Sequence, residues 1–167
     1  MSTKAIQNVI KSVLVHPLEA ALCCLLLSMV VVTFSQVVSR YLLHASLSWS
    51  EELARFLLMW LTMLSAAYGF KTRSHMALTF FVNRFGNRTR RSVSILITLA
   101  MSVFLIIFIV KAVELTQSVV DRIGPGTQLS FAVPYSSTIV GGVLMLFYVA
   151  RTGWREIRGD FEPSTDK

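Results

Sequence analysis

Long apolar segments separated by short polar ones dominate the sequence. Four such segments lie at about residues 18–43, 49–70, 92–116 and 133–154. Each is long enough to cross roughly 30 Å of hydrocarbon as a helix that rises about 1.5 Å per residue. The pattern predicts an all-α integral membrane protein with four transmembrane helices, forming one domain over residues 1–167.

The first sixteen residues have a different pattern. Apolar side chains recur there at helical spacing, with lysines between them: Ile6, Val9, Ile10, Val13 and Leu14 beside Lys4 and Lys11. Such a segment is typical of a helix that lies on the membrane surface with its apolar face in the lipid. We therefore expect a short N-terminal amphipathic interfacial helix before the first span.

The composition supports a membrane protein. Of the 167 residues, 54% are hydrophobic and only 15% are charged, whereas soluble domains carry about 25% charged residues. The net charge of +7 does not indicate nucleic acid as a partner, because the basic residues lie in the short segments between apolar blocks. Cys23 and Cys24 are adjacent inside the first span and lack metal-site spacing, so we interpret them as packing residues.

The distribution of lysine and arginine predicts the orientation. Two basic residues lie in the N-terminal segment, six in the segment 71–91 and four in the C-terminal segment, whereas acids accompany the few basic residues near 44–50 and 117–132. Cytoplasmic loops are enriched in lysine and arginine. We therefore expect both termini and the segment 71–91 in the cytoplasm, and the two other loops outside.

The second span contains a stripe of charged and small residues at spacings of three and four: Glu51, Glu52, Arg55, Thr62, Ser65, Ala66 and Gly69. Small residues let another helix approach closely, so one hypothesis is a docking surface with a charged outer end, which Arg40 could reach. The alternative is an ordinary interface cluster in which Glu51 and Arg55 pair. Trp60, near the middle of the span, could pack against another subunit or face lipid.

Other functional classes have weaker support. Haem would need two histidines at matching depth on facing helices, but His16, His44 and His75 all lie outside the hydrocarbon region. Every acid lies at a span end, so no ionisable site is predicted near the midplane, and no catalytic or metal-binding motif occurs. The pair Gly141-Gly142 in the last span indicates close helix packing. The sequence therefore predicts a protein that packs against a partner, with no catalysis and no cofactor of its own.

The same residues carry a family resemblance. The run from Arg40 through Ser48-Trp49-Ser50-Glu51-Glu52-Leu53-Ala54-Arg55 to Trp60, Gly69, Lys71, Arg73 and His75-Met76 resembles the signature of the small membrane (DctQ-like) subunit of TRAP transporters, the tripartite ATP-independent periplasmic systems. The stretch 128–135 is also similar to that family. The resemblance covers nearly the whole chain and is most specific over residues 40–76.

The resemblance implies a function in the bacterial inner membrane. In this family a periplasmic substrate-binding protein delivers an organic anion, a carboxylate or sialic acid, to a membrane pair. The large subunit carries the substrate and sodium sites and moves as an elevator, and the small subunit supports it as a scaffold. The expected partners are therefore the large subunit, the binding protein and membrane lipid. Symport with sodium is expected of the heterodimer.

The resemblance also assigns roles to matching positions. Five residues are expected to contact the large subunit, or to fix the first two spans against each other: Trp49, Glu52, Arg55, Trp60 and Gly69. Arg40 is expected to pair with Glu51 or Glu52. Lys71, Arg73 and His75 are expected to contact the lipid headgroups on the inner side or the partner. Two alternatives remain open: a membrane anchor of a respiratory enzyme, and a small homo-oligomeric membrane protein.

Overall fold

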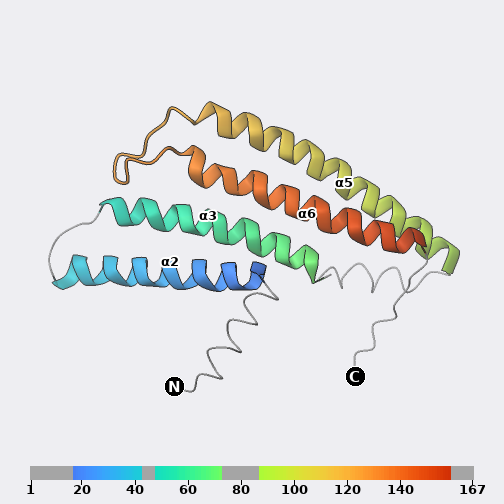
Figure 1. The fold of residues 1–167 in the computed structure, drawn as a ribbon, viewed down its shortest axis with the longest axis horizontal. Coiled ribbons are helices and arrows are strands. Elements are labelled where there is room, and N and C mark those ends of the chain that lie inside the picture. The colour runs from blue at the N-terminus through green and yellow to red at the C-terminus, as the bar shows by residue number, and fades with distance from the viewer. Residues whose placement is uncertain (1–16, 43–47, 73–86, 159–167) are drawn as a thin grey trace, which may run out of the picture.

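The computed structural model consists of four long helices (Figure 1). They are α2 (Pro17–Leu42), α3 (Ser48–Lys71), α5 (Asn87–Ser118) and α6 (Ala132–Arg158). The described residues are 17–42, 48–72 and 87–158. All four helices are long and apolar enough to cross a membrane. The predicted all-α membrane class is confirmed, whereas the predicted interfacial helix falls outside the described residues.

The helix ends follow from local sequence. Pro17 stands at the first position of α2 with Glu19 in the first turn, and both residue types favour a helix N-terminus. Helices α5 and α6 are longer than their predicted spans, since α5 begins at Asn87 and α6 ends at Arg158. Arginine is a good helix former, so the backbone continues as helix through basic residues that lie beyond the apolar run.

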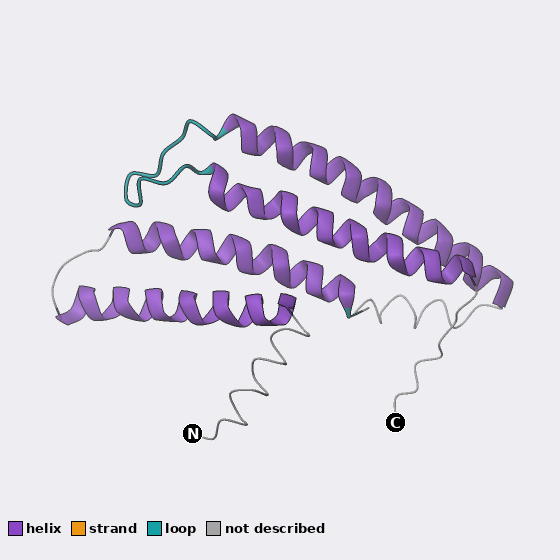
Figure 2. Ribbon diagram, viewed as in Figure 1, coloured by secondary structure: helices purple, strands orange, loops and turns teal. Residues whose placement is uncertain are grey.

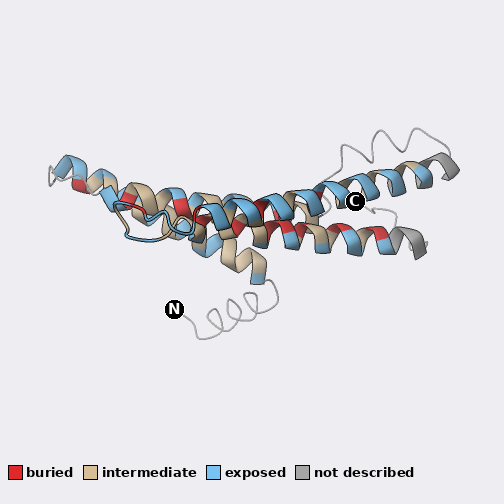
Figure 3. Cartoon of the chain, turned by 90° about the horizontal axis from the view of Figure 1, so that it is seen from above, coloured by how far each residue is buried: buried red, intermediate tan, exposed pale blue. Residues whose placement is uncertain are grey.

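The helices form a single row in the order α2–α3–α6–α5 (Figure 1). Among these four elements, α2 contacts only α3, and α5 contacts only α6. Seen from above, the helices overlap in the left half of the view and spread apart towards the right (Figure 3). The chain therefore consists of two helical hairpins, α2–α3 and α5–α6, which meet along one seam between α3 and α6.

The two ends of the row differ in chemistry. At one end lie the end of α2, the start of α3 and the loop 119–131, which is drawn in teal in Figure 2; we call it the hairpin end. At the opposite end α3 finishes in Lys71 and α6 in a segment that contains Arg151, Arg155 and Arg158. The row thus has a strongly basic end, as the sequence predicts for a cytoplasmic face.

The core lies along the helix contacts. A buried cluster joins Ala67 of α3, Leu105 of α5, and Met145 and Val149 of α6. Many other apolar side chains remain exposed, among them Phe34 of α2 at 68%. Exposed residues lie along the outer surface of the helices (Figure 3), and many of them are large and apolar, as expected for helices whose solvent is lipid.

Two adjacent glycines set the spacing of the central helices. A Cβ atom on Gly141 would lie 2.9 Å from Met63 Cβ of α3, and one on Gly142 would lie 2.9 Å from Ile109 Cγ1 of α5. Helix α6 therefore approaches both neighbours closely through these two positions. The close packing that the sequence predicts for Gly141-Gly142 is confirmed.

Replacing Gly141 by leucine should destabilise the folded chain. The added side chain meets Met63 and the backbone of α3, and such overpacking costs roughly 1–3 kcal/mol. Gly69→Leu is the matched control, because nothing lies within 4 Å of a Cβ built on Gly69. Unfolding in detergent should show a loss for Gly141→Leu alone. Equal losses for both variants would contradict the tight seam.

Candidate functional site

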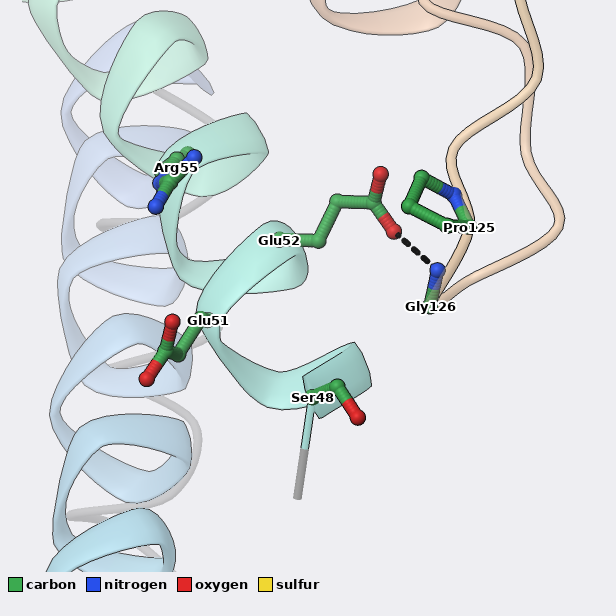
Figure 4. A pocket seen from close by; sticks show the side chains of 6 residues that line it. All are labelled: Ser48, Glu51, Glu52, Arg55, Pro125 and Gly126. Atoms are coloured by element: carbon green, nitrogen blue, oxygen red, sulfur yellow. Dashed lines mark hydrogen bonds between the residues drawn. The ribbon is translucent and has the colours of Figure 1, made fainter. Parts of the chain in front are cut away.

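The hairpin end holds a cluster of polar contacts around the first turns of α3. A partly open cavity of about 260 Å³ lies there, lined by Ser48, Glu51, Glu52, Arg55, Pro125 and Gly126 (Figure 4). The lining side chains come from α3 and from the loop between α5 and α6. The cavity therefore marks the place where the two helical hairpins meet outside their apolar contact.

Glu52 points from α3 into the loop (Figure 4). Its Oε2 accepts hydrogen bonds from the backbone N–H of Gly126 at 3.0 Å, from the backbone N–H of Thr127 at 2.7 Å and from the Thr127 hydroxyl at 3.0 Å. Hydrogen bonds to an ionised acceptor are roughly twice as strong as neutral ones. One carboxylate oxygen thus fastens the loop to the start of α3; we call these three bonds the Glu52 latch.

The loop has a shape that suits this contact. Its arms are joined by hydrogen bonds from Phe131 N to Arg122 O at 2.9 Å and from Gly124 N to Leu129 O at 2.8 Å. Pro125 and Gly126 are typical turn residues, and Gln128 has a left-handed backbone with φ of 57°, a region that non-glycine residues rarely adopt. The loop is a folded turn that presents two adjacent N–H groups to Glu52.

Neighbouring contacts reinforce the turn. The Ser130 hydroxyl donates to Val120 O at 2.6 Å and accepts from the N–H of Ala132 at 3.1 Å, at the start of α6. The rings of Phe56 and Phe131 pack edge to face with centroids 5.7 Å apart. An apolar contact between α3 and the loop therefore lies directly beside the Glu52 latch.

Glu51 and Arg55 leave α3 on the other side from Glu52 (Figure 4). The Arg40 guanidinium donates to Glu51 Oε1 at 3.0 Å, so the structure pairs Arg40 with one of the two acids that the sequence left open. Within the described part of the chain, no ion pair joins Arg55 to Glu51 or to another carboxylate. Arg55 is exposed.

A second ion pair joins α2 and α3 at the basic end. Lys71 Nζ lies 3.3 Å from Glu19 Oε1 and 5.5 Å from the centre of the Tyr68 ring. Lys71, expected to reach lipid headgroups or a partner, thus has an acceptor within its own chain. Arg73 and His75 fall outside the described residues. The hairpin α2–α3 therefore carries an ion pair near each end.

The five predicted docking residues do not lie on one face. Arg55 and Gly69 belong to a line of residues at helical spacing on α3, the open stripe: Arg55, Leu58, Thr62, Ser65 and Gly69. All are exposed except Gly69, which is half-buried but would have no neighbour within 4 Å of an added Cβ. Trp60 is half-buried, and nine residues at about 100° each place it opposite Gly69.

The other two docking candidates lie at the turn. Glu52 is engaged by the loop, and the backbone of Trp49 packs under Gly126, where an added Cβ would lie 2.9 Å from Trp49 Cα. Sequence reasoning did not single out Gly126 or Thr127 as partners of α3. The Pro-Gly pair predicts a turn, but its 74-residue separation from Glu52 hides the contact.

Known proteins match over most of the chain. Residues 29–159 match the family model described as the DctQ component of tripartite ATP-independent periplasmic transporters. The chain belongs to this family of TRAP transporter small permease subunits. It is therefore a multi-pass membrane protein of a transport system and not an enzyme.

Individual relatives agree with the family. The chain is 34% identical to the small permease protein SiaQ of a sialic acid TRAP transporter from Vibrio cholerae, over 88% of this chain and 80% of SiaQ. It is 24% identical to the DctQ small permease protein of a C4-dicarboxylate TRAP transporter from the same organism, over 81% and 68%. A sialic acid TRAP permease, SiaT of Haemophilus influenzae, matches 47% of this chain at 28% identity, over 13% of its own length.

Separate and joint substitution of Arg40 and Glu51 by alanine should show a weak coupling. The two side chains are 57% and 44% exposed, and exposed ion pairs contribute about 0.2–1 kcal/mol. The measurement is a double-mutant cycle of unfolding free energies in detergent. A coupling of several kcal/mol would mean that this pair, and not packing, holds α2 against α3.

Proposed function

We propose that this chain is the scaffold subunit of a TRAP transporter that imports an organic anion, a carboxylate or sialic acid, together with sodium. The large permease subunit carries the substrate and sodium sites, and a periplasmic binding protein delivers the substrate. The chain lies in the bacterial inner membrane with both termini in the cytoplasm. The hairpin end then faces the periplasm and the binding protein.

The helix row is the observation that supports a scaffold role. Four helices in an open row enclose no pathway, because α2 and α5 each contact a single neighbour. Large apolar side chains are exposed on both outer helices, with Phe34 at 68% and Phe104 at 65%. A layer of this kind offers area for packing against a larger membrane protein but forms no channel by itself.

The open stripe of α3 is the part of this area that best suits a partner helix. Its members alternate at three and four residues, so they lie on one face. The Thr62 hydroxyl donates to Leu58 O of its own helix at 2.7 Å. Three members of the stripe, Thr62, Ser65 and Gly69, are thus small, and the Thr62 hydroxyl is already bonded. Close van der Waals packing through small residues drives helix association in lipid.

The charged end of the stripe adds direction to the contact. Arg55 is exposed and lines the cavity at the hairpin end, while the carboxylates of Glu51 and Glu52 already accept other hydrogen bonds. An acidic group on the large permease would therefore find an available guanidinium at this point. Charge complementarity of this kind mainly fixes the register of an interface.

Co-purification and transport together test the proposed function. A tagged copy of this chain should retain the large permease in mild detergent. Proteoliposomes with both subunits should take up substrate when binding protein and a sodium gradient are present. Uptake by this chain alone would refute the scaffold role. Recovery only as a self-complex, without the large permease, would favour a homo-oligomeric protein.

Gly69→Leu should weaken recovery of the large permease several-fold while leaving this chain folded. The leucine side chain would project from the open stripe and hold a partner helix away. Met59→Leu, a volume-conserving change on a half-buried residue of the same helix, is the control. Full recovery with Gly69→Leu would place the partner on another face of the row.

A further inference from the structure

The Glu52 latch lies at the only junction between the two halves of the described fold. The backbone of α2 does not come close to α5 or α6, and that of α5 does not come close to α2 or α3. Every described helix contact between the hairpins therefore passes along the α3–α6 seam. The Glu52 latch joins the same two hairpins at the hairpin end, through bonds that span 74 and 75 residues of sequence.

Lipid makes such a junction depend on specific contacts. Apolar side chains gain little by leaving lipid for another helix, so helix association relies on close packing and hydrogen bonds. The seam has close packing at Gly141 and Met63, and the Phe56–Phe131 contact nearer the loop. Three hydrogen bonds to one charged oxygen are the strongest polar link between the hairpins in the described residues.

The loop is built to receive a carboxylate of this length. A Cβ on Gly124 would collide with the Glu52 carboxylate, and one on Gly126 would lie 2.9 Å from Trp49 Cα. Both positions thus require glycine for the loop to sit so close to α3. Adjacent backbone N–H groups in a turn form a natural anion site, which Glu52 fills from within the chain.

We propose that Glu52 is a positioning residue that fixes the two helical hairpins relative to each other, and not a contact to the large permease. Resting on the scaffold function proposed above, this assigns Glu52 a role in transport through the shape of the docking surface. The α2–α3 hairpin carries the open stripe, and the α5–α6 hairpin completes the layer. A partner that packs against both requires them in a fixed relation.

Spin-label distances on the full chain in lipid nanodiscs test this role. Labels go on cysteines at Tyr41 and Gln117, both exposed and near the hairpin-end termini of α2 and α5, after Cys23 and Cys24 are replaced by alanine. With Glu52 in place, the distance between the two labels should have a narrow distribution. Glu52→Ala should broaden and shift it, because the loop is no longer fastened to α3.

Glu51→Ala is the matched control. It removes the same charge one residue away, but Glu51 faces Arg40 and makes no bond to the loop. Its distribution should stay narrow. Glu52→Ala with a distribution as narrow as that of Glu51→Ala would overturn the proposal.

Milder variants keep the test decisive if Glu52→Ala does not fold. Thr127→Val removes the hydroxyl donor but keeps the side-chain shape, and Gly126→Ala pushes the turn from the Trp49 backbone. Each should broaden the distribution, and Glu52→Gln should do so less than alanine because an amide oxygen still accepts. Narrow distributions in all three would refute the Glu52 latch as the positioning element.

Assembly with the large permease separates this proposal from the scaffold function. Failure of the wild-type chain to retain the permease would count against the scaffold function alone, since the distances are measured on this chain by itself. Reconstituted Glu52→Ala complexes should show transport reduced several-fold, with Glu114→Ala, which removes an exposed carboxylate paired with Lys111 of its own helix, close to wild type. Loss of the permease from Glu52→Ala with an unchanged distance distribution would instead make Glu52 a partner contact and overturn the proposal.

Discussion

The seam between α3 and α6 is the constraint on which the described fold depends. Each outer helix contacts one inner helix. The relation between the two hairpins is therefore decided by the parallel helices α3 and α6 and by the loop at the end where both begin. In water a buried apolar core would hold such halves together, but lipid offers no comparable driving force. The close approach of the helices at glycine and the Glu52 latch hold the two hairpins together instead.

This arrangement separates two tasks along one helix. The side of α3 towards α6 and the loop carries Phe56, Ala67 and Glu52, all engaged within the chain. Another side of α3 carries the open stripe, whose members are exposed apart from the half-buried Gly69. The scaffold role proposed above would need both: an internal seam that keeps the shape of the subunit, and a surface available for assembly.

The sequence predicts the four helices well, but it does not predict which helices lie next to each other. Apolar block length predicts each helix, because crossing a bilayer demands it, and Gly141-Gly142 predicts close approach because few other residues permit it. Hydropathy says nothing about the order α2–α3–α6–α5, since lipid-facing and helix-facing residues are equally apolar. The bond between Glu52 and Thr127 was also hidden, because its partners are backbone N–H groups, which every residue except proline carries.

The internal bond of Thr62 to Leu58 bears on how such a subunit is made. Its hydroxyl, exposed at membrane depth, already has an acceptor in its own helix, so acyl chains can cover it without leaving a bare donor. A newly inserted chain can therefore be stable in the bilayer before it binds a partner. If the large permease packs on the open stripe as proposed, the four helices can fold first, and the partner later replaces the lipid along α3.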